Sequence, residues 1–167
     1  MKKFLRIAAL LLALCLLALC LLAGCTSGDL DKSFTCRELT MTVPVIMKDV
    51  SDQDEFASFT FALDSSLVAI FGLNETFEEY PVLKDYDTQD YAQLIISGNS
   101  LDALVTERLN QDYHYFVYSA DTEDGEYTYV VGIFENDNGF WMIQMCCPSM
   151  LMDRENCLEY LDSVTFS

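Results

Sequence analysis

The sequence predicts an α+β domain in which helices cover an antiparallel sheet of about six strands. Three observations support this. The C-terminal half contains apolar segments separated by short polar turns, as in an antiparallel meander. Segments 87–97 and 151–161 have apolar residues at helical spacing. Segment 140–147 is apolar on both faces, with Gln144 as its one polar residue, and a strand of that kind needs cover on both faces.

The N-terminal part of the domain predicts a strand followed by a hairpin. From Cys36 to Val43, apolar and polar residues alternate, with Arg37, Leu39, Met41 and Val43 on one side. Pro44 ends this strand. Alternation returns over 58–63, and after a turn at 64–66 an apolar strand covers 67–73. Two strands joined by so short a turn indicate a hairpin.

The first helix is expected over 87–97. Asp87 is a suitable N-cap, and Asp90 in the first turn favours the helix dipole. Gly98-Asn99 ends the helix. Its expected apolar face consists of Tyr91, Leu94 and Ile95.

Segment 101–109 fits two structures. Leu101, Leu104, Val105 and Leu109 would line a helix, whereas Ala103, Val105 and Glu107 would share one face of a strand. The long meander that follows favours the strand.

The meander itself comprises strands over 113–120, 126–134 and 140–147, with turns at 121–125 and 136–139. Asn138-Gly139 supplies residues that tolerate positive φ in the second turn. In the third strand one face is expected to carry Trp141, Ile143, Met145 and Cys147, and the other Phe140, Met142 and Cys146. The two helices and the N-terminal hairpin are the expected cover.

After Pro148, a second helix is expected over 151–161, with Leu158 and Leu161 facing inward. A short strand over 163–166 ends the chain.

The first 25 residues predict export. Lys2, Lys3 and Arg6 precede an apolar run of 17 residues, Ile7–Ala23. That length is near the lower limit for a membrane span, and no basic flank follows it, as is typical of a signal peptide. The alternatives are a retained transmembrane anchor and an ordinary signal peptide.

The segment Leu22-Ala23-Gly24-Cys25 resembles a bacterial lipobox, in which small residues precede the modified Cys. Cys15 and Cys20 each follow a bulky Leu and do not fit. The resemblance implies cleavage before Cys25, a diacylglyceryl group on Cys25, and a lipid-anchored protein on the extracytoplasmic face of the cell membrane. The expected organisation is a signal peptide over 1–24, the lipidated Cys and a short polar tether over 25–33, and one globular domain over 34–167.

The exported part is strongly acidic. The chain has 9 Lys and Arg against 27 Asp and Glu, and removal of Lys2, Lys3 and Arg6 leaves a net charge of −21. Such a surface repels nucleic acids and anionic lipid headgroups. The lipid on Cys25 is therefore the expected membrane link, and no other cofactor is expected. High solubility is the simplest reading of this charge, and a cationic partner or loosely held divalent cations are the alternatives.

Four further cysteines follow Cys25, namely Cys36, Cys146, Cys147 and Cys157. Export permits disulfides, and four cysteines allow three complete pairings. Adjacent residues of one strand face opposite ways, so Cys146 and Cys147 should not bond each other. Buried free thiols are favoured, because two of the cysteines lie in a very apolar strand. The absence of a Cys-x-x-Cys pair and the single His argue against a structural zinc site.

Candidate chemistry is sparse. His114 has no evident nucleophile or orienting acid, which argues against a catalytic base. Asp121, Glu123, Asp124 and Glu126 lack the spacing of an EF-hand calcium loop, because Gly125 occupies the fifth position. The remaining candidate is a cluster on two neighbouring strands: Tyr113, Tyr115, Tyr118, Tyr127 and Tyr129. Cross-strand packing and a partner-binding face both explain it.

A family resemblance rests on Tyr127-Thr128-Tyr129, Phe140 to Met145, Leu161 to Phe166, and the early Leu39 to Pro44. These segments are similar to small bacterial lipoproteins whose domain resembles the PsbP-like α/β/α sandwich. The resemblance implies an antiparallel sheet with helices on both faces and a role in the cell envelope. It carries over no catalytic residue.

The sequence therefore favours a non-enzymatic, membrane-anchored module that binds another envelope protein. An accessory lipoprotein that binds a small ligand or a cation is the alternative. The oligomeric state, the identity of the partner and the type of membrane stay open.

Overall fold

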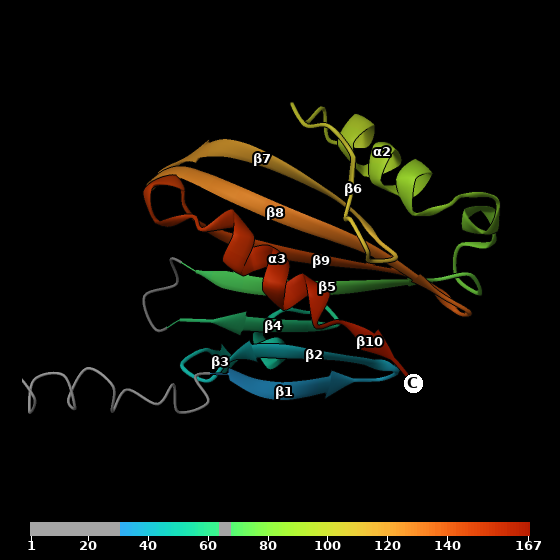
Figure 1. Cartoon of the computed structure of the whole chain (residues 1–167), viewed down its shortest axis with the longest axis horizontal. Coiled ribbons are helices and arrows are strands. Elements are labelled where there is room, and N and C mark those ends of the chain that lie inside the picture. Colours follow the sequence, from blue (N-terminus) through green and yellow to red (C-terminus); the bar gives the residue numbers. More distant parts are fainter. Residues whose placement is uncertain (1–30, 64–67) are drawn as a thin grey trace, which may run out of the picture. The chain divides into compact units, whose positions relative to one another are not determined.

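The computed structural model of the protein describes residues 31–63 and 68–167 (Figure 1). The chain divides into two units, Met1–Leu30 and Asp31–Ser167, and all the described elements belong to the second. Cys25, the expected signal peptide and the expected turn at 64–66 lie outside the described residues. In the part of the chain that is described, no helix is long and apolar enough to cross a membrane.

The unit is α+β, and its main sheet has seven antiparallel strands in the order β3-β4-β5-β9-β8-β7-β6. The strands are β3 (Lys48–Asp49), β4 (Phe59–Ala62), β5 (Ala69–Thr76), β6 (Thr106–Glu107), β7 (His114–Thr122), β8 (Gly125–Asn136) and β9 (Gly139–Pro148). The prediction of about six strands was wrong because β3 and β6, with two residues each, are too short to show alternation. Of the two structures considered for segment 101–109, the strand is the one that forms, but it is limited to Thr106 and Glu107. No part of the segment is helical.

A second sheet has three strands, β1 (Asp31–Cys36), β2 (Leu39–Pro44) and β10 (Thr165–Phe166), in the order β1-β2-β10. The expected tether was too long, because Asp31–Ser33 pairs with β2 as part of β1. The expected strand over 36–43 is interrupted at Arg37, whose φ of 53° turns the chain from β1 into β2. The alternation within β2 is confirmed, since Leu39, Met41 and Val43 are buried.

The first helix, α2 (Thr88–Gly98), begins as predicted, because the Asp87 carboxylate accepts a hydrogen bond from the Asp90 backbone N–H at 2.8 Å. Its predicted inner face is confirmed for Tyr91 and for Ile95, which packs against the core cluster, but was wrong for Leu94. Tyr91, Ala92 and Ile96 are buried, whereas Leu94 is 45% exposed. The Tyr91 ring stacks flat on Phe140, with centroids 4.5 Å apart and an interplanar angle of 6°, and this contact fixes the rotation of the helix.

The second helix, α3 (Arg154–Asp162), starts three residues later than predicted. The Asp153 side chain caps it by accepting from the Asn156 N–H, and residues 149–151 instead form the short 3-10 helix η3 (Ser149–Leu151). Leu158 and Leu161 face inward as predicted. Two other 3-10 turns are η1 (Ser51–Gln53) and η2 (Pro81–Asp85).

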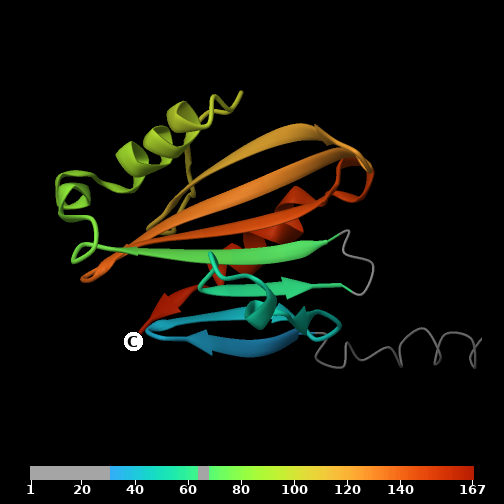
Figure 2. The same cartoon turned by 180° about the vertical axis from the view of Figure 1, so that it is seen from behind.

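Strand β9 is apolar on both faces, as predicted, but its cover is unequal: the α3 face is buried along the strand, whereas on the α2 face Phe140 is buried and Met142 and Cys146 are half-buried (Figures 1 and 2). Trp141, Ile143 and Met145 pack in one cluster with Leu158 and Leu161 of α3. Phe140 belongs to the opposite cluster, where α2 contributes its buried residues. The expected cover differs in one respect. Segment 58–73 is not a covering hairpin, because β4 and β5 extend the main sheet, and the β1–β2 hairpin covers the α3 face instead.

The turn between β8 and β9 forms for a different reason than expected. Neither Asn138 nor Gly139 has a positive φ. The Asn136 side-chain oxygen accepts from the N–H groups of both residues, at 2.9 and 3.0 Å, which closes the turn. Gly139 is required because an added Cβ would lie 2.2 Å from the Glu75 carbonyl oxygen.

Candidate functional site

The five tyrosines do not form one surface. Tyr113 and Tyr115 are buried in the cluster beneath α3, whereas Tyr118 packs against the cluster beneath α2. Tyr129 lies opposite Tyr118 in the register and so shares its face, as does Tyr127, two residues before Tyr129 on β8. The split follows from the period of two along a strand: odd and even positions of β7 face opposite ways.

Tyr113 and Tyr115 hold α3 to the sheet. The Tyr113 hydroxyl donates to Asp162 at 2.8 Å, and Arg108 donates to the same carboxylate through Nε and Nη2. The hydrogen bonds from Arg108 lower the pKa of Asp162. The Arg154 guanidinium lies 5.2 Å from the centre of the Tyr115 ring. These contacts account for both buried rings without a partner.

On the α2 face, Tyr118 of β7 and Tyr129 of β8 stack with centroids 4.6 Å apart and an angle of 6° between the rings. Both are half-buried. The Tyr118 hydroxyl donates to the Gln144 side-chain oxygen of β9 at 3.2 Å. Burial raises the pKa of Tyr118 to about 12, so this hydroxyl remains a donor well into alkaline pH. We call Tyr118, Tyr129 and Gln144 the tyrosine face.

A cavity of about 200 Å³ adjoins the tyrosine face at the C-terminal end of α2. Its lining is mainly apolar with a few amide and hydroxyl groups: Ile95, Asn99, Leu101, Phe116, Tyr118, Met142 and Gln144. Helix α2 covers only part of this side of the sheet, and Figure 2 shows β5, β9, β8 and β7 continuing past it with no other helix of residues 31–63 and 68–167 over them. The site thus joins a half-buried pair of stacked tyrosines to a small cavity.

Sequence reasoning selected Tyr118 and Tyr129 but missed Gln144 and the cavity residues of α2. A signal was available for Gln144, which is the one polar side chain in an otherwise apolar strand. Its pairing with Tyr118 depends on strand order, because β7 and β9 lie on either side of β8.

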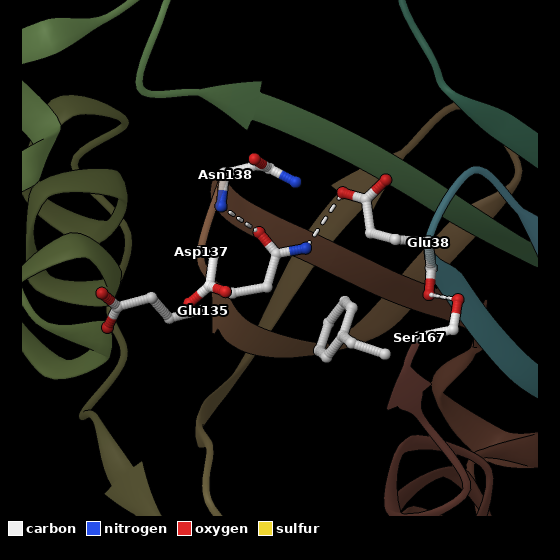
Figure 3. A pocket seen from close by; sticks show the side chains of 7 residues that line it. Glu38, Glu135, Asp137, Asn138 and Ser167 are labelled. Atoms are coloured by element: carbon white, nitrogen blue, oxygen red, sulfur yellow. Dashed lines mark hydrogen bonds between the residues drawn. The ribbon is translucent and has the colours of Figure 1, made fainter.

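A second cavity, of about 330 Å³, is lined by three carboxylate side chains near the β8–β9 turn: Glu38, Glu135 and Asp137 (Figure 3). Glu38 has a structural role, because its carboxylate accepts hydrogen bonds from Asn136 Nδ2 at 2.9 Å and from Trp141 Nε1 at 3.2 Å. Burial opposes its ionisation, but these bonds lower the pKa of Glu38. Glu135 points away from Glu38 in Figure 3. Among the described residues no group of three or more His, Cys, Asp or Glu side chains is placed to hold a metal ion.

The remaining candidates have structural positions or are exposed. His114 Nδ1 and Thr88 Oγ1 form a hydrogen bond of 2.8 Å that joins β7 to the first turn of α2. Asp121, Glu123, Asp124 and Glu126 are exposed around the β7–β8 turn, where Gly125 adopts a φ of +115°.

The four described cysteines are free thiols. Cys147 lies on the α3 face of β9 with Trp141 and Ile143, and Cys146 lies on the opposite face, as the alternation predicts. Cys157 is on α3 and packs against the cluster beneath that helix.

Alkylation of Cys157 is expected to be slow in the folded protein. Burial raises the pKa of this thiol from 9.0 to about 11. The thiolate is the nucleophile, so a rise of two units lowers its population near neutral pH about a hundredfold. Iodoacetamide labelling followed by peptide mass spectrometry measures the rate at each cysteine. Unfolding the chain in denaturant is the control and should restore fast labelling. Equal rates in the folded and unfolded protein would contradict the burial of Cys157.

No family model matches the sequence, and no curated protein matches it. Solved structures share the fold. A protein of Bacteroides thetaiotaomicron has a TM-score of 0.58 at 14% identity, covering 83% of this chain and 49% of its own. Cyanobacterial PsbP (CyanoP) from Synechocystis has a TM-score of 0.54 at 10% identity, covering 82% of this chain and 91% of its own. The chain spans about half the length of the Bacteroides protein and most of CyanoP. The described unit therefore has a PsbP-like fold.

Proposed function

We propose that this protein is a non-enzymatic, lipid-anchored module on the extracytoplasmic face of the cell membrane, and that it binds another envelope protein through the tyrosine face. The observation that carries the proposal is the stacked, half-buried pair of Tyr118 and Tyr129 beside the cavity at the C-terminal end of α2. Tyr is enriched at protein interfaces, where its ring packs and its hydroxyl finds a polar partner.

The anchoring rests on the segment around Cys25. The net charge of −21 after removal of the signal peptide opposes adsorption to anionic headgroups. The two acyl chains of a diacylglyceryl group suffice for stable attachment, whereas one does not. The PsbP-like fold agrees with this proposal, and α2 and α3, which pack in opposite core clusters, fit an α/β/α arrangement.

A second candidate function is the binding of a small ligand. The cavity beside the tyrosine face favours it, because an apolar lining with a few polar groups is typical of ligand sites. Its volume of about 200 Å³ suits a compact molecule.

Replacing both Tyr118 and Tyr129 by Ala should abolish capture of a membrane protein by the tagged, full-length chain in detergent extracts. The double substitution removes the stacked rings and the hydroxyl that reaches Gln144. Affinity purification with quantitative mass spectrometry measures capture. Tyr80→Ala is the matched control, since Tyr80 is 49% exposed and lies outside both core clusters.

Thermal unfolding of both variants checks that they are folded. A partner retained by the folded double variant would contradict the proposal. A small molecule that native mass spectrometry finds on the wild type, with no partner protein, would favour the second candidate.

A further inference from the structure

Among the described residues, few pair with the outer edge of β7. β6 pairs only with His114 and Tyr115, through Glu107 and Thr106. From Phe116 to Thr122, no strand or backbone hydrogen bond among the described residues joins the edge that faces away from β8. An edge of this kind is a template for another strand.

The register identifies the free backbone groups. The Arg108 N–H donates to the Tyr113 carbonyl at 3.1 Å, so odd-numbered residues of β7 direct their backbone groups toward the β6 side. The two-residue turn between Thr122 and Gly125 supports this assignment. In such a turn the flanking residues hydrogen-bond to each other, so the even-numbered residues of β7 direct their backbone groups toward β8. The N–H and C=O groups of Ser119 and Asp121 therefore point away from the sheet.

Beside this edge, the chain before β6 separates from β7 and leaves a gap. A cavity of about 340 Å³ is lined by Asp102 and Leu104 on one side and by Tyr115 and Val117 on the other. Leu104 is 85% exposed, although the residues on either side of it are half-buried. Thr106 and Arg154 also line the gap, so it offers apolar surface and one positive side chain next to unpaired backbone groups.

The charge at the end of this edge is one-sided. Asp121, Glu123, Asp124 and Glu126 are exposed around the β7–β8 turn, and no Lys or Arg lies between Arg108 and Arg154 in the sequence. A basic segment would complement this turn, and an acidic one would be repelled.

We infer that the β7 edge binds an extended, basic segment of a partner protein by strand addition. The added strand runs antiparallel to β7, as β6 does, and pairs with Ser119 and Asp121. Its basic N-terminal residues lie beside the acidic turn, and an apolar side chain farther along enters the gap next to Val117. Backbone pairing supplies affinity in this mode, and the side chains supply specificity. The inference rests on the partner-binding function proposed above, because it names the chemistry of the partner.

The test uses the full-length protein in detergent and a fluorescent peptide, Lys-Lys-Thr-Val-Thr-Val, with Glu-Glu-Thr-Val-Thr-Val as its charge-reversed control. Fluorescence anisotropy should show that the protein binds the basic peptide and not the acidic control. Added salt should weaken the binding of the basic peptide. Ser119→Pro removes the outward N–H and spares the ladder to β8, so it should weaken binding about fivefold or more relative to Ser119→Ala. The alanine variant controls for loss of the Ser119 hydroxyl, which hydrogen-bonds to Thr128.

Hydrogen exchange gives a second readout that needs no variant. In the free protein the Ser119 and Asp121 amides should exchange fast and the Tyr118 and Ala120 amides slowly, and the basic peptide should slow the first two. Equal peptide affinity of the folded proline and alanine variants, or no added protection at Ser119 and Asp121, would overturn strand addition. A partner protein lost by the Tyr118 and Tyr129 variant but kept by Ser119→Pro would overturn it too, while leaving the tyrosine face as the binding site.

Discussion

Trp141→Ala is expected to lower the free energy of unfolding by about 3–5 kcal/mol. The Trp141 side chain is fully buried at the centre of the main sheet, on the face beneath α3. Its ring lies 6.2 Å from that of Phe59, and its Nε1 donates to Glu38 at 3.2 Å. Removing the ring leaves a cavity among packed side chains and takes one of two side-chain donors from the Glu38 carboxylate.

Chemical denaturation followed by circular dichroism measures the loss, because the substitution removes the chain's one Trp and its fluorescence. Trp141→Phe is the conservative variant, and it should be less destabilising because it keeps an aromatic ring in the site. Phe56→Ala is the surface control, since Phe56 is 79% exposed, and it should change stability by about 0.5 kcal/mol or less. A loss below about 1 kcal/mol for Trp141→Ala would contradict a packed ring.

Cys25→Ala is expected to abolish lipid attachment and to release the protein from the membrane or block its processing. Cys25 alone among the first three cysteines follows a small residue, Gly24. The sulfur of Cys25 would carry the diacylglyceryl group, and Cys15 and Cys20 do not fit the motif because each follows Leu. Metabolic labelling with a fatty acid and cell fractionation measure both effects.

Cys20→Ala is the matched control for this experiment. Cys20 lies in the same apolar run but follows Leu19, so its removal should leave labelling, cleavage and membrane attachment unchanged. A Cys25→Ala protein that is still labelled and still cut at the same bond would refute the lipobox assignment.

The tyrosines show where sequence reasoning reached its limit. Alternation along β7 and β8 places each ring on one face or the other, and this much is local. The burial of each ring depends on where the two helices pack. Tyr113 and Tyr115 are buried beneath α3, whereas Tyr118 and Tyr129 are half-buried. Gln144 joins the tyrosine face only because the register brings β9 next to β8.

By itself the sequence determined the local features: the α+β class, the two-sided apolar strand β9, the Asp87 cap of α2 and the inward Leu158 and Leu161. Each depends on neighbours within a few residues along the chain, so periodicity and capping reveal it. The tertiary structure alone decided the rest: the two-residue edge strands, the β1–β2 hairpin as cover, the rotation of α2 and the open edge of β7. These depend on contacts between residues distant in sequence, such as Tyr91 with Phe140. Such contacts produce no periodic pattern of residues from which they could be predicted.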